Sequence, residues 1–392
     1  MKRVLIVPQL QSHLLSAEVL ENKLKQKSNY ISYINTSNIY GYNFDKGLNI
    51  SEPYWAKKKL YQYNGIKRNV LEVIYWHYNR TKILEKLKEV DVIIIFSEPS
   101  FIRSLVYSSK KWGIKTHLIM EGMRSENRLP ISMWSVLNFK ALMGQIKLRA
   151  TYKLAKMFQS TRIYPFLPGL NGCTSVDFIY PLGEYSRGVI SNIVAPKSKI
   201  LPYGIPKYTN RNWSNLGLLE KNENATQNVL YITSAFDWHG KKEFAESQKR
   251  DLKLLAEKID LLPNKSLFVR LHPKENVSNY EFLGEFQCFK GFRNNDSFED
   301  IALHYGKIYA NISTMIAELS LLGIVVRPIL INFNRLLLLR NFTSVLDDKQ
   351  IVDRESKLVH SLSENNENLR TNYNLIYNDE KGLNKLLENL LK

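Results

Sequence analysis

A histidine, a proline and a lysine follow directly on a short run of strand character, Leu267–Leu271. Proline ends a strand, because its nitrogen cannot donate a ladder hydrogen bond and because it keeps the preceding residue out of helical angles. His272 is therefore predicted at the carboxyl end of the strand, immediately before Pro273. Ligands of open α/β sheets bind at that end. A phosphate group could be held there by His272 with Arg270 and Lys274, and a chance dipeptide with a structural histidine is the alternative.

Two hydroxyl residues, Ser313 and Thr314, follow a second short strand pattern, where a helix is predicted to begin. Serine and threonine at this position often cap the helix. The same hydroxyls, with the helix's first N–H groups and its positive dipole end, also form an anion site. Glu318 follows one turn later and is either a surface acid or a ligand-binding carboxylate. Because His272 and this pair occur in successive strand–helix units, we predict one shared phosphate site.

Thr233 and Ser234 follow another apolar run, Asn228–Ile232, and are predicted to lie at a strand end of the same domain. Asp237 and His239 come next in that loop. Since this domain carries the residues suited to phosphate, we expect Thr233 and Ser234 to contact the phosphate-bearing ligand.

Two carboxylates end strand patterns in the first half of the chain. Glu98 follows the run Asp91–Phe96, and Glu121 follows Thr116–Met120 and precedes Gly122. Glycine lets a substrate approach the backbone closely, although a turn with an exposed acid has the same pattern. A catalytic base must reach the proton it accepts and must be ionised at the working pH. Both carboxylates meet the second condition beside cations, and Glu121 is the first choice.

The elements that position these residues alternate along the chain, strand after helix. Such alternation predicts an α/β architecture with parallel sheets, and 392 residues with 44% hydrophobic content can form two cores. We predict an N-terminal domain over residues 1–206 and a polar, Asn-rich linker over 207–227. A second domain is predicted over 228–372, followed by a C-terminal helix over 373–392.

The sequence has neither a disulfide framework nor a metal-ligand spacing, since its two cysteines are the isolated Cys173 and Cys288. A reducing, cytoplasmic compartment is the natural expectation. The N-terminal residues predict a buried strand rather than a signal peptide. We find no apolar stretch long enough for a membrane-spanning helix.

The formal net charge of +18 indicates an anionic partner. No Asp or Glu occurs in Asn127–Val176, which is rich in large apolar residues. Its cations are Arg128, Lys140, Lys147, Arg149, Lys153, Lys156 and Arg162. A basic helical stretch of this kind is typical of membrane-surface elements, and a partly buried helix whose lysines reach water is the alternative. We therefore expect a peripheral protein on an anionic membrane surface.

Three short motifs together resemble those of bacterial sialyltransferases and polysialyltransferases, in order and in rough separation. They are Glu121-Gly122, His272-Pro273 and Ser313-Thr314. One departure is that Met120 stands where the family usually has a first acid before the glycine, which bears on the identity of the base. Each motif is two residues long, so the resemblance depends on their joint placement.

The resemblance implies a GT-B fold, in which two doubly wound (Rossmann-like) domains face each other across a cleft. It implies a metal-independent, inverting glycosyltransferase without a cofactor, using a CMP-linked donor of sialic acid or a related nonulosonate and a surface glycan or glycolipid acceptor. His272 and Pro273 would form the donor phosphate site with Ser313 and Thr314, and Glu318 would accept from the ribose hydroxyls. Glu121 would be the base. The enzyme would work on the inner face of the cell membrane.

Rival functions divide into three classes. A capsule-type Kdo transferase or a CDP-glycerol glycerophosphotransferase shares the predicted architecture. A nucleic-acid-binding protein would suit the charge and the 45 aromatic residues (22 Tyr, 17 Phe and 6 Trp), but the chain has no nucleic-acid-binding signature, so no specific nucleic acid is expected. Met120, which replaces an acid of the motif, would be consistent with a catalytically inactive GT-B scaffold.

Overall fold

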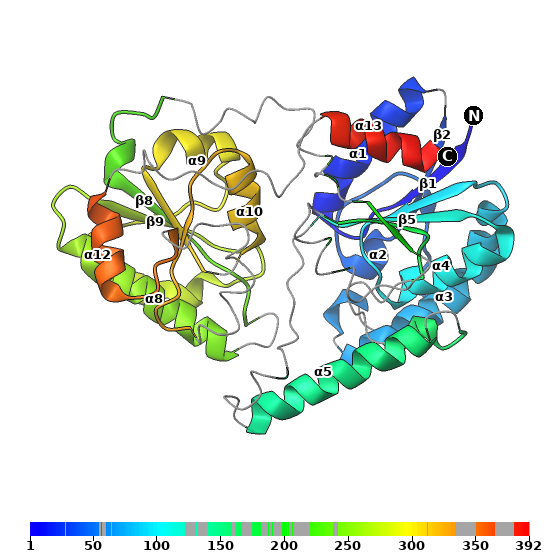
Figure 1. The fold of residues 1–392 in the computed structure, drawn as a ribbon, viewed down its shortest axis with the longest axis horizontal. Helices are drawn as coiled ribbons and strands as arrows, with labels where there is room; N and C mark the ends of the chain where they lie inside the picture. The colour runs from blue at the N-terminus through cyan, green and yellow to red at the C-terminus, as the bar shows by residue number, and fades with distance from the viewer. Residues whose placement is uncertain are drawn as a thin grey trace. The chain divides into compact units, whose positions relative to one another are not determined.

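The computed structural model describes residues 1–27, 29–54, 56, 60–63, 65–121, 131, 139–158, 161–166, 175–181, 187, 190, 198–201, 203, 206, 220–237, 242–311, 313–333, 350–364 and 380–391. The chain divides into two compact units, each built on a parallel sheet (Figure 1). The first unit comprises Met1–Arg211 with Ile376–Lys392, and the second comprises Asn212–Leu375.

The sheet of the first unit has the strand order β3-β2-β1-β4-β5-β6-β7, with every pair parallel. Its strands are β1 (Arg3–Val7), β2 (Tyr30–Asn35), β3 (Leu48–Asn49), β4 (Val92–Ile95), β5 (Lys115–Ile119), β6 (Phe178–Tyr180) and β7 (Lys199–Ile200). The chain builds outward from β1 in one direction and then, from β4, in the other. The strand order therefore reverses between β1 and β4, the point at which doubly wound sheets bind ligands.

Alternate residues of β1 and β4 pack into two separate cores, one on each face of the sheet. Leu5 and Ile93 face α3 (Gly65–Leu87) and α4 (Ser100–Ser109). On the other face Ile6 packs with α1 (Gln11–Gln26). Burial on both faces explains why these strands are continuous apolar runs. The shorter helices of the unit are α2 (Ser37–Tyr40), η1 (Leu60–Gln62), η2 (Lys110–Trp112) and η4 (Tyr164–Phe166), and the long α5 (Phe139–Phe158) follows β5.

The last helix, α13 (Glu380–Leu391), completes the second of these two cores. Its leucines recur at intervals of three and four residues, so they share one helix face. Leu383, Leu386, Leu387 and Leu390 are buried with residues of β1, β4 and α1. Figure 1 shows α13 beside α1. The chain's final helix thus packs in the first unit, although most of the chain before it, Asn212–Leu375, belongs to the second unit.

The second unit has the strand order β10-β9-β8-β11-β12, again parallel throughout. Its strands are β8 (Asn228–Ile232), β9 (Ser266–Arg270), β10 (Phe289–Phe292), β11 (Lys307–Ala310) and β12 (Arg327–Pro328), and its helices are η6 (Ala225–Gln227), α8 (Lys242–Asp260), η7 (Val277–Glu285), α9 (Phe298–His304), α10 (Thr314–Leu321) and α12 (Glu355–Ser363). One core packs β8 and β9 against α8 and α12. Here the strand order reverses between β8 and β11, so the predicted doubly wound architecture of both domains is confirmed.

We expect Leu387→Ala in α13 to lower the unfolding free energy of the first unit by about 2–5 kcal/mol, because it leaves a cavity at a fully buried leucine. Hydrogen exchange read by mass spectrometry should show faster exchange in β1 and β4 and no change in β8 and β9. Lys385→Ala, on the exposed face of the same helix, is the control and should change neither. Unchanged exchange in β1 for Leu387→Ala would contradict this packing.

Candidate functional site

The carboxyl ends of β9, β8 and β11 lie side by side at one edge of the second unit's sheet. Arg270 of β9 pairs with Ile232 of β8, which pairs in turn with Ala310 of β11. The residues that follow these three strand ends include Thr233, His272 and Ser313. The structure therefore brings together, at the switch point of this sheet, most of the residues predicted from the sequence to bind phosphate.

His272 is half-buried and is oriented by the backbone around it. Its N–H donates to Thr233 Oγ1 (2.9 Å), which fixes the β9 end against the β8 end. Its ring nitrogen Nδ1 accepts a hydrogen bond from the Lys274 N–H (3.2 Å). A neutral imidazole that accepts at Nδ1 carries its proton on Nε2. His272 therefore presents Nε2–H as its hydrogen-bond donor, while Pro273 and Lys274 are exposed beside it.

Beneath the two strand ends, the carboxylate of Glu275 accepts several hydrogen bonds. Thr233 Oγ1 donates to its Oε2, and the His272 N–H lies 3.3 Å from the same oxygen. The Tyr280 hydroxyl (2.6 Å) and Gln248 Nε2 (3.2 Å) donate to its Oε1. Burial, and next the bond to Glu275, raise the pKa of the Tyr280 phenol, so it stays a neutral donor. The carboxylate ties the β8 end to the β9 end.

Thr233 and Ser234 are both buried, and their visible roles are to shape the loop. Gln248, a fully buried residue of α8, accepts from the Ser234 N–H (2.8 Å) and donates to the Ser234 carbonyl (3.1 Å). The Thr233 N–H donates to the Arg270 carbonyl (3.0 Å). These contacts fix the backbone conformation at the switch point. Contact of Thr233 and Ser234 with a nucleotide-sugar donor remains a prediction.

Ser313 is the N-cap of α10. Its backbone is extended, and its Oγ accepts from the Met315 N–H (3.2 Å), which is the capping role that serine favours. Thr314 is the first residue of the helix, and its side chain lies outside the described residues. Glu318 is half-buried, and its charge acts to raise the pKa of Arg270, which burial lowers overall. The carboxylate of Glu318 is thus close enough to interact electrostatically with Arg270 at the end of β9.

A second buried carboxylate, Asp251 of α8, ties together other segments of the same edge. Its Oδ1 accepts from the Asn332 N–H (3.0 Å) and side-chain amide (2.7 Å), and its Oδ2 accepts from Asn311 Nδ2 (3.3 Å). Asn311, next after β11, also accepts from the Tyr231 hydroxyl of β8. Burial raises the pKa of Asp251 to about 6. This residue is not among those predicted from the sequence.

In the first unit, Gln9 spans the switch point between β1 and β4. It follows β1, and its Oε1 accepts from the backbone N–H groups of Phe96 (3.1 Å) and Ser97 (2.9 Å) beyond β4. Its Nε2 donates to the Val7 carbonyl. The side chain therefore links the two strand ends where the sheet order reverses. Like Asp251, Gln9 is a residue that the sequence pattern did not predict.

The two candidate bases follow the neighbouring strands β4 and β5 and have different surroundings. Glu98 Oε1 accepts from the Tyr164 hydroxyl (2.9 Å), and its carbonyl accepts from Arg103 Nε (2.8 Å). The carboxylate oxygens of Glu121 are shielded from solvent. Its charge contributes, after burial, to the raised pKa of Tyr203. Glu98 thus has a clear structural role in holding Tyr164, whereas Glu121 lies beside a buried phenol.

The Glu121-Gly122 motif and the loop after β8 fall partly outside the described residues. Gly122 and His239 are not described, whereas Asp237, beyond β8, is described and exposed. Among the residues that the structure describes, no group of three or more His, Cys, Asp or Glu side chains could hold a metal ion.

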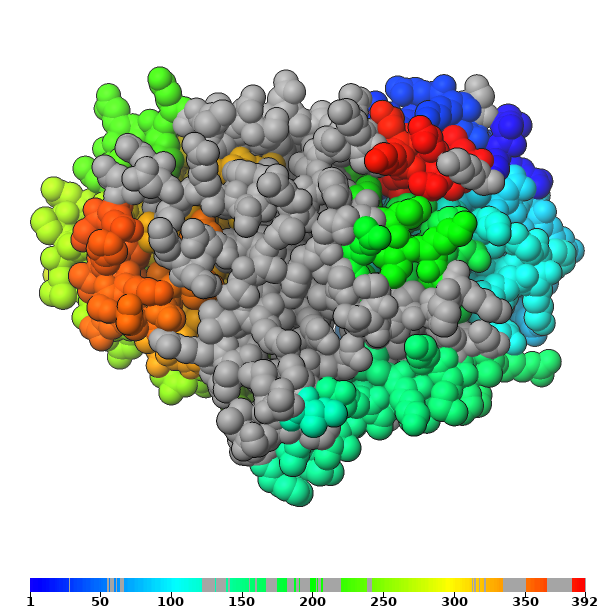
Figure 2. Space-filling model, viewed as in Figure 1, coloured from blue at the N-terminus to red at the C-terminus, as the bar shows by residue number. Residues whose placement is uncertain are grey.

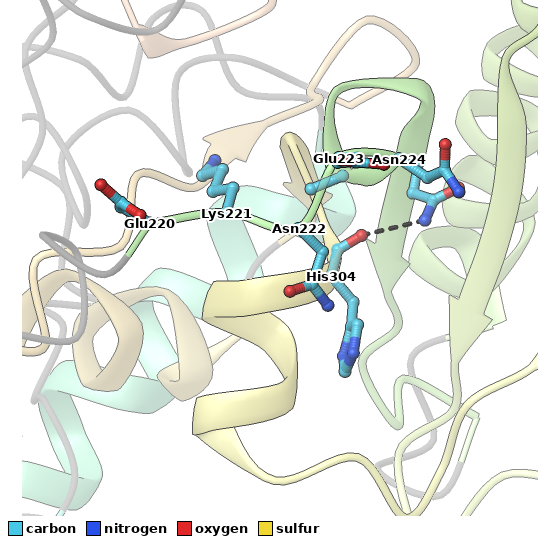
Figure 3. Close-up of a pocket in the computed structure, with 8 residues that line it drawn as sticks. Glu220, Lys221, Asn222, Glu223, Asn224 and His304 are labelled. Atoms are coloured by element: carbon cyan, nitrogen blue, oxygen red, sulfur yellow. Dashed lines mark hydrogen bonds between the residues drawn. The ribbon is translucent and has the colours of Figure 1, made fainter.

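A cavity of about 670 Å³ opens at the other edge of the second unit's sheet (Figure 3). It is lined by Glu220, Lys221, Asn222, Glu223, Asn224, Ala225, Asn228 and His304. Asn228, the first residue of β8, donates to the His304 carbonyl (3.0 Å). Because β8 begins here and its other end, Ile232, precedes Thr233, the cavity lies away from the switch point and takes no part in the candidate site.

No protein-family model and no curated protein matches the chain. Solved structures of similar fold include the UDP-GlcNAc 2-epimerase of Methanocaldococcus jannaschii in complex with UDP-GlcNAc and UDP, with a TM-score of 0.60 at 12% identity over 100% of this chain and 99% of that one. The UDP-GlcNAc 2-epimerase of Neisseria meningitidis bound to UDP-GlcNAc has a TM-score of 0.58 at 13% identity over 100% of both chains. Arabidopsis thaliana UGT89C1 complexed with UDP-L-rhamnose has a TM-score of 0.52 at 11% identity over 100% and 94%.

Identities this low carry information on the fold alone. The likeness extends over the whole chain, and it agrees with the two doubly wound parallel sheets described above. The chain therefore has the two-domain GT-B fold that the sequence predicts.

Proposed function

We propose that the chain is a metal-independent inverting glycosyltransferase that moves a sugar from a nucleotide donor to a surface glycan. The observation that carries the proposal is the joint placement of Thr233, His272 and Ser313 at the switch point of a GT-B domain. The three short motifs favour sialic acid or a related nonulosonate, carried on CMP, as the sugar transferred. The full-length structural neighbours that bind UDP-sugars support a nucleotide sugar as the donor class.

In the proposed donor complex, His272 Nε2–H donates to a phosphate oxygen. Ser313 and Thr314 lie where α10 begins, so the first N–H groups of the helix and its dipole favour the remaining phosphate charge. Glu318, one turn into the helix, accepts from the ribose hydroxyls. Pro273 ends the strand so that the histidine ring stands at the sheet edge.

In the proposed transfer step, the acceptor hydroxyl oxygen bonds to the anomeric carbon as the bond from that carbon to the phosphate oxygen breaks. Glu121 takes the hydroxyl proton, and the nucleotide leaves with the bonding electrons. Attack from the face opposite the leaving group inverts the anomeric centre. Protein donors must stabilise the charge on the departing nucleotide when no metal takes part, and His272 supplies one of them.

Epimerisation is a second candidate function, because the structural neighbours that span the full chain include UDP-GlcNAc 2-epimerases. In that case the chain would isomerise a nucleotide sugar rather than transfer its glycosyl group. Three more functions are compatible with the same fold, namely capsule-type Kdo transfer, glycerophosphate transfer from CDP-glycerol, and an inactive scaffold.

We further propose that the enzyme is cytoplasmic and works on the inner face of the cell membrane, where a glycolipid acceptor would lie. The net charge of +18 and the acid-free stretch support an anionic membrane surface as partner.

Incubation with CMP-, CDP- and UDP-linked donors separates these functions. We expect slow release of CMP from a CMP-linked nonulosonate, without added metal and undiminished by EDTA, and faster release with a glycan acceptor present. Nuclear magnetic resonance of the same mixtures would detect an isomerised nucleotide sugar, which would favour the epimerase. Turnover of CDP-glycerol alone would move the chain to the glycerophosphotransferases, and turnover of no donor would favour the scaffold.

His272→Ala should lower the transfer rate by about 10²-fold or more, the scale of losing one transition-state donor. The fold should survive, because His272 is half-buried at a rim. His304→Ala removes an exposed histidine from the opposite sheet edge of the same unit, and it should leave the rate unchanged. Steady-state kinetics and thermal melting of both variants check this, and a His272→Ala enzyme with normal turnover would refute the donor site.

Glu121→Gln should abolish transfer while donor affinity stays near that of the wild type, because the amide keeps the shape of the carboxylate and cannot accept the proton. Glu98→Gln is the matched comparison. It keeps an oxygen for the Tyr164 hydroxyl and should lose much less activity. Transfer rates alongside nucleotide affinities measured by calorimetry test both variants. Near-normal transfer by Glu121→Gln would leave Glu121 with a structural role and move the role of base to Glu98 or His239.

A further inference from the structure

Helix α5 (Phe139–Phe158) exposes large apolar side chains and contains no Asp or Glu. Phe139 is 79% exposed and Met157 is 63% exposed, at opposite ends of the helix. Met143, Ile146, Ala150 and Leu154 are exposed between them. Exposed apolar residues are ordinary when scattered, but a continuous row of them indicates an interaction surface.

These six residues form one stripe. At 3.6 residues per turn they lie within roughly 80° of the helix circumference. The opposite side of α5 faces the protein, since Gln145 is buried and Arg149 and Tyr152 are half-buried. Figure 2 shows α5 as a ridge on the surface of its unit. We call this row of residues the α5 stripe.

Two exposed lysines border the stripe, and a third lies farther round the helix. Lys147 lies on one side of it and Lys153 on the other, and Lys156 adds a third exposed cation in the last turn. With no acid in the helix to pair with them, these charges favour an anionic partner. Lysine is depleted from protein–protein interfaces, whereas lysines beside a row of apolar side chains are typical of helices that lie in a membrane surface.

We propose that the α5 stripe docks on an anionic lipid bilayer, with α5 lying in the plane of the interface. The apolar side chains enter the boundary between head groups and acyl chains, and the lysine ammonium groups stay with the lipid phosphates. No helix among the described residues is long and apolar enough to cross a membrane, so docking of this kind is a surface contact. The contact is independent of donor chemistry, and its test needs no turnover.

Sedimentation of the full chain with vesicles tests the proposal, using phosphatidylcholine alone and phosphatidylcholine mixed with the anionic lipid phosphatidylglycerol. The wild type should bind the anionic vesicles and release as salt rises. Replacing Lys147, Lys153 and Lys156 by Glu should lower the partition coefficient by about 100-fold or more. Replacing Met143, Ile146 and Met157 by Gln should lower it by about tenfold or more, with thermal stability unchanged because all three are exposed.

A matched charge control separates this surface from the overall charge. Lys88, Lys111 and Lys253 are exposed outside α5, and replacing them by Glu changes the net charge equally. This control should keep most of the vesicle binding. Equal loss in the control, full binding by either α5 variant, or equal binding of the wild type to neutral vesicles at high salt would overturn the proposal. So would a wild-type dimer that the Gln variant converts to a monomer without any vesicle binding, because the stripe would then join two copies.

Discussion

The candidate donor site depends on the hydrogen bonds that the carboxylate of Glu275 accepts. It accepts from the Thr233 hydroxyl and the Tyr280 hydroxyl, and so holds the residues after β8 and β9 together. Parallel strands place their ends at one edge, but the register alone leaves the loops beyond them undefined. A partly buried carboxylate with several donors defines them, because each broken bond would leave an unsatisfied polar group. This arrangement also positions His272, since the His272 N–H donates to Thr233 Oγ1.

Asp251 holds together the ends of β8 and β11 and the segment after β12 in the same way. Its raised pKa shows that burying this carboxylate costs stability. Burial raises the pKa to about 6, above the ordinary value of 3.8. Between these two pH values the folded state binds more protons than the unfolded state, so stability falls as pH rises through this window. At neutral pH the ionised carboxylate therefore lowers stability. The hydrogen bonds donated by Asn311 and Asn332 offset part of this cost, and they position the strand ends beside the start of α10.

The sequence predicts those features of the structure whose interacting residues are close together along the chain. Strands such as Val92–Ile95 are evident because burial on both faces demands apolar runs, and His272-Pro273 reveals a strand end because proline acts locally. The sequence does not predict Gln9 and Asp251, because the strand-end partners of these two residues are about 60–90 residues away, and no local pattern encodes such pairs. One signal was available for Asp251: with Gln248 it interrupts the apolar face of α8, where a polar residue needs a buried partner. For α13 the sequence predicts a C-terminal helix, but not the sheet that its leucines cover.

The bond from the Lys274 N–H to His272 Nδ1 also determines what the histidine contributes to the proposed reaction. A ring that accepts a hydrogen bond at Nδ1 carries its proton on Nε2. In the proposed donor complex His272 would therefore act as a directed hydrogen-bond donor. In that proposal, Arg270, Lys274 and the N-terminal end of α10 would supply the positive charge that balances the phosphate. Positioning and charge neutralisation would then fall to different residues of this edge, and the hydrogen bond between Glu275 and Thr233 would serve positioning.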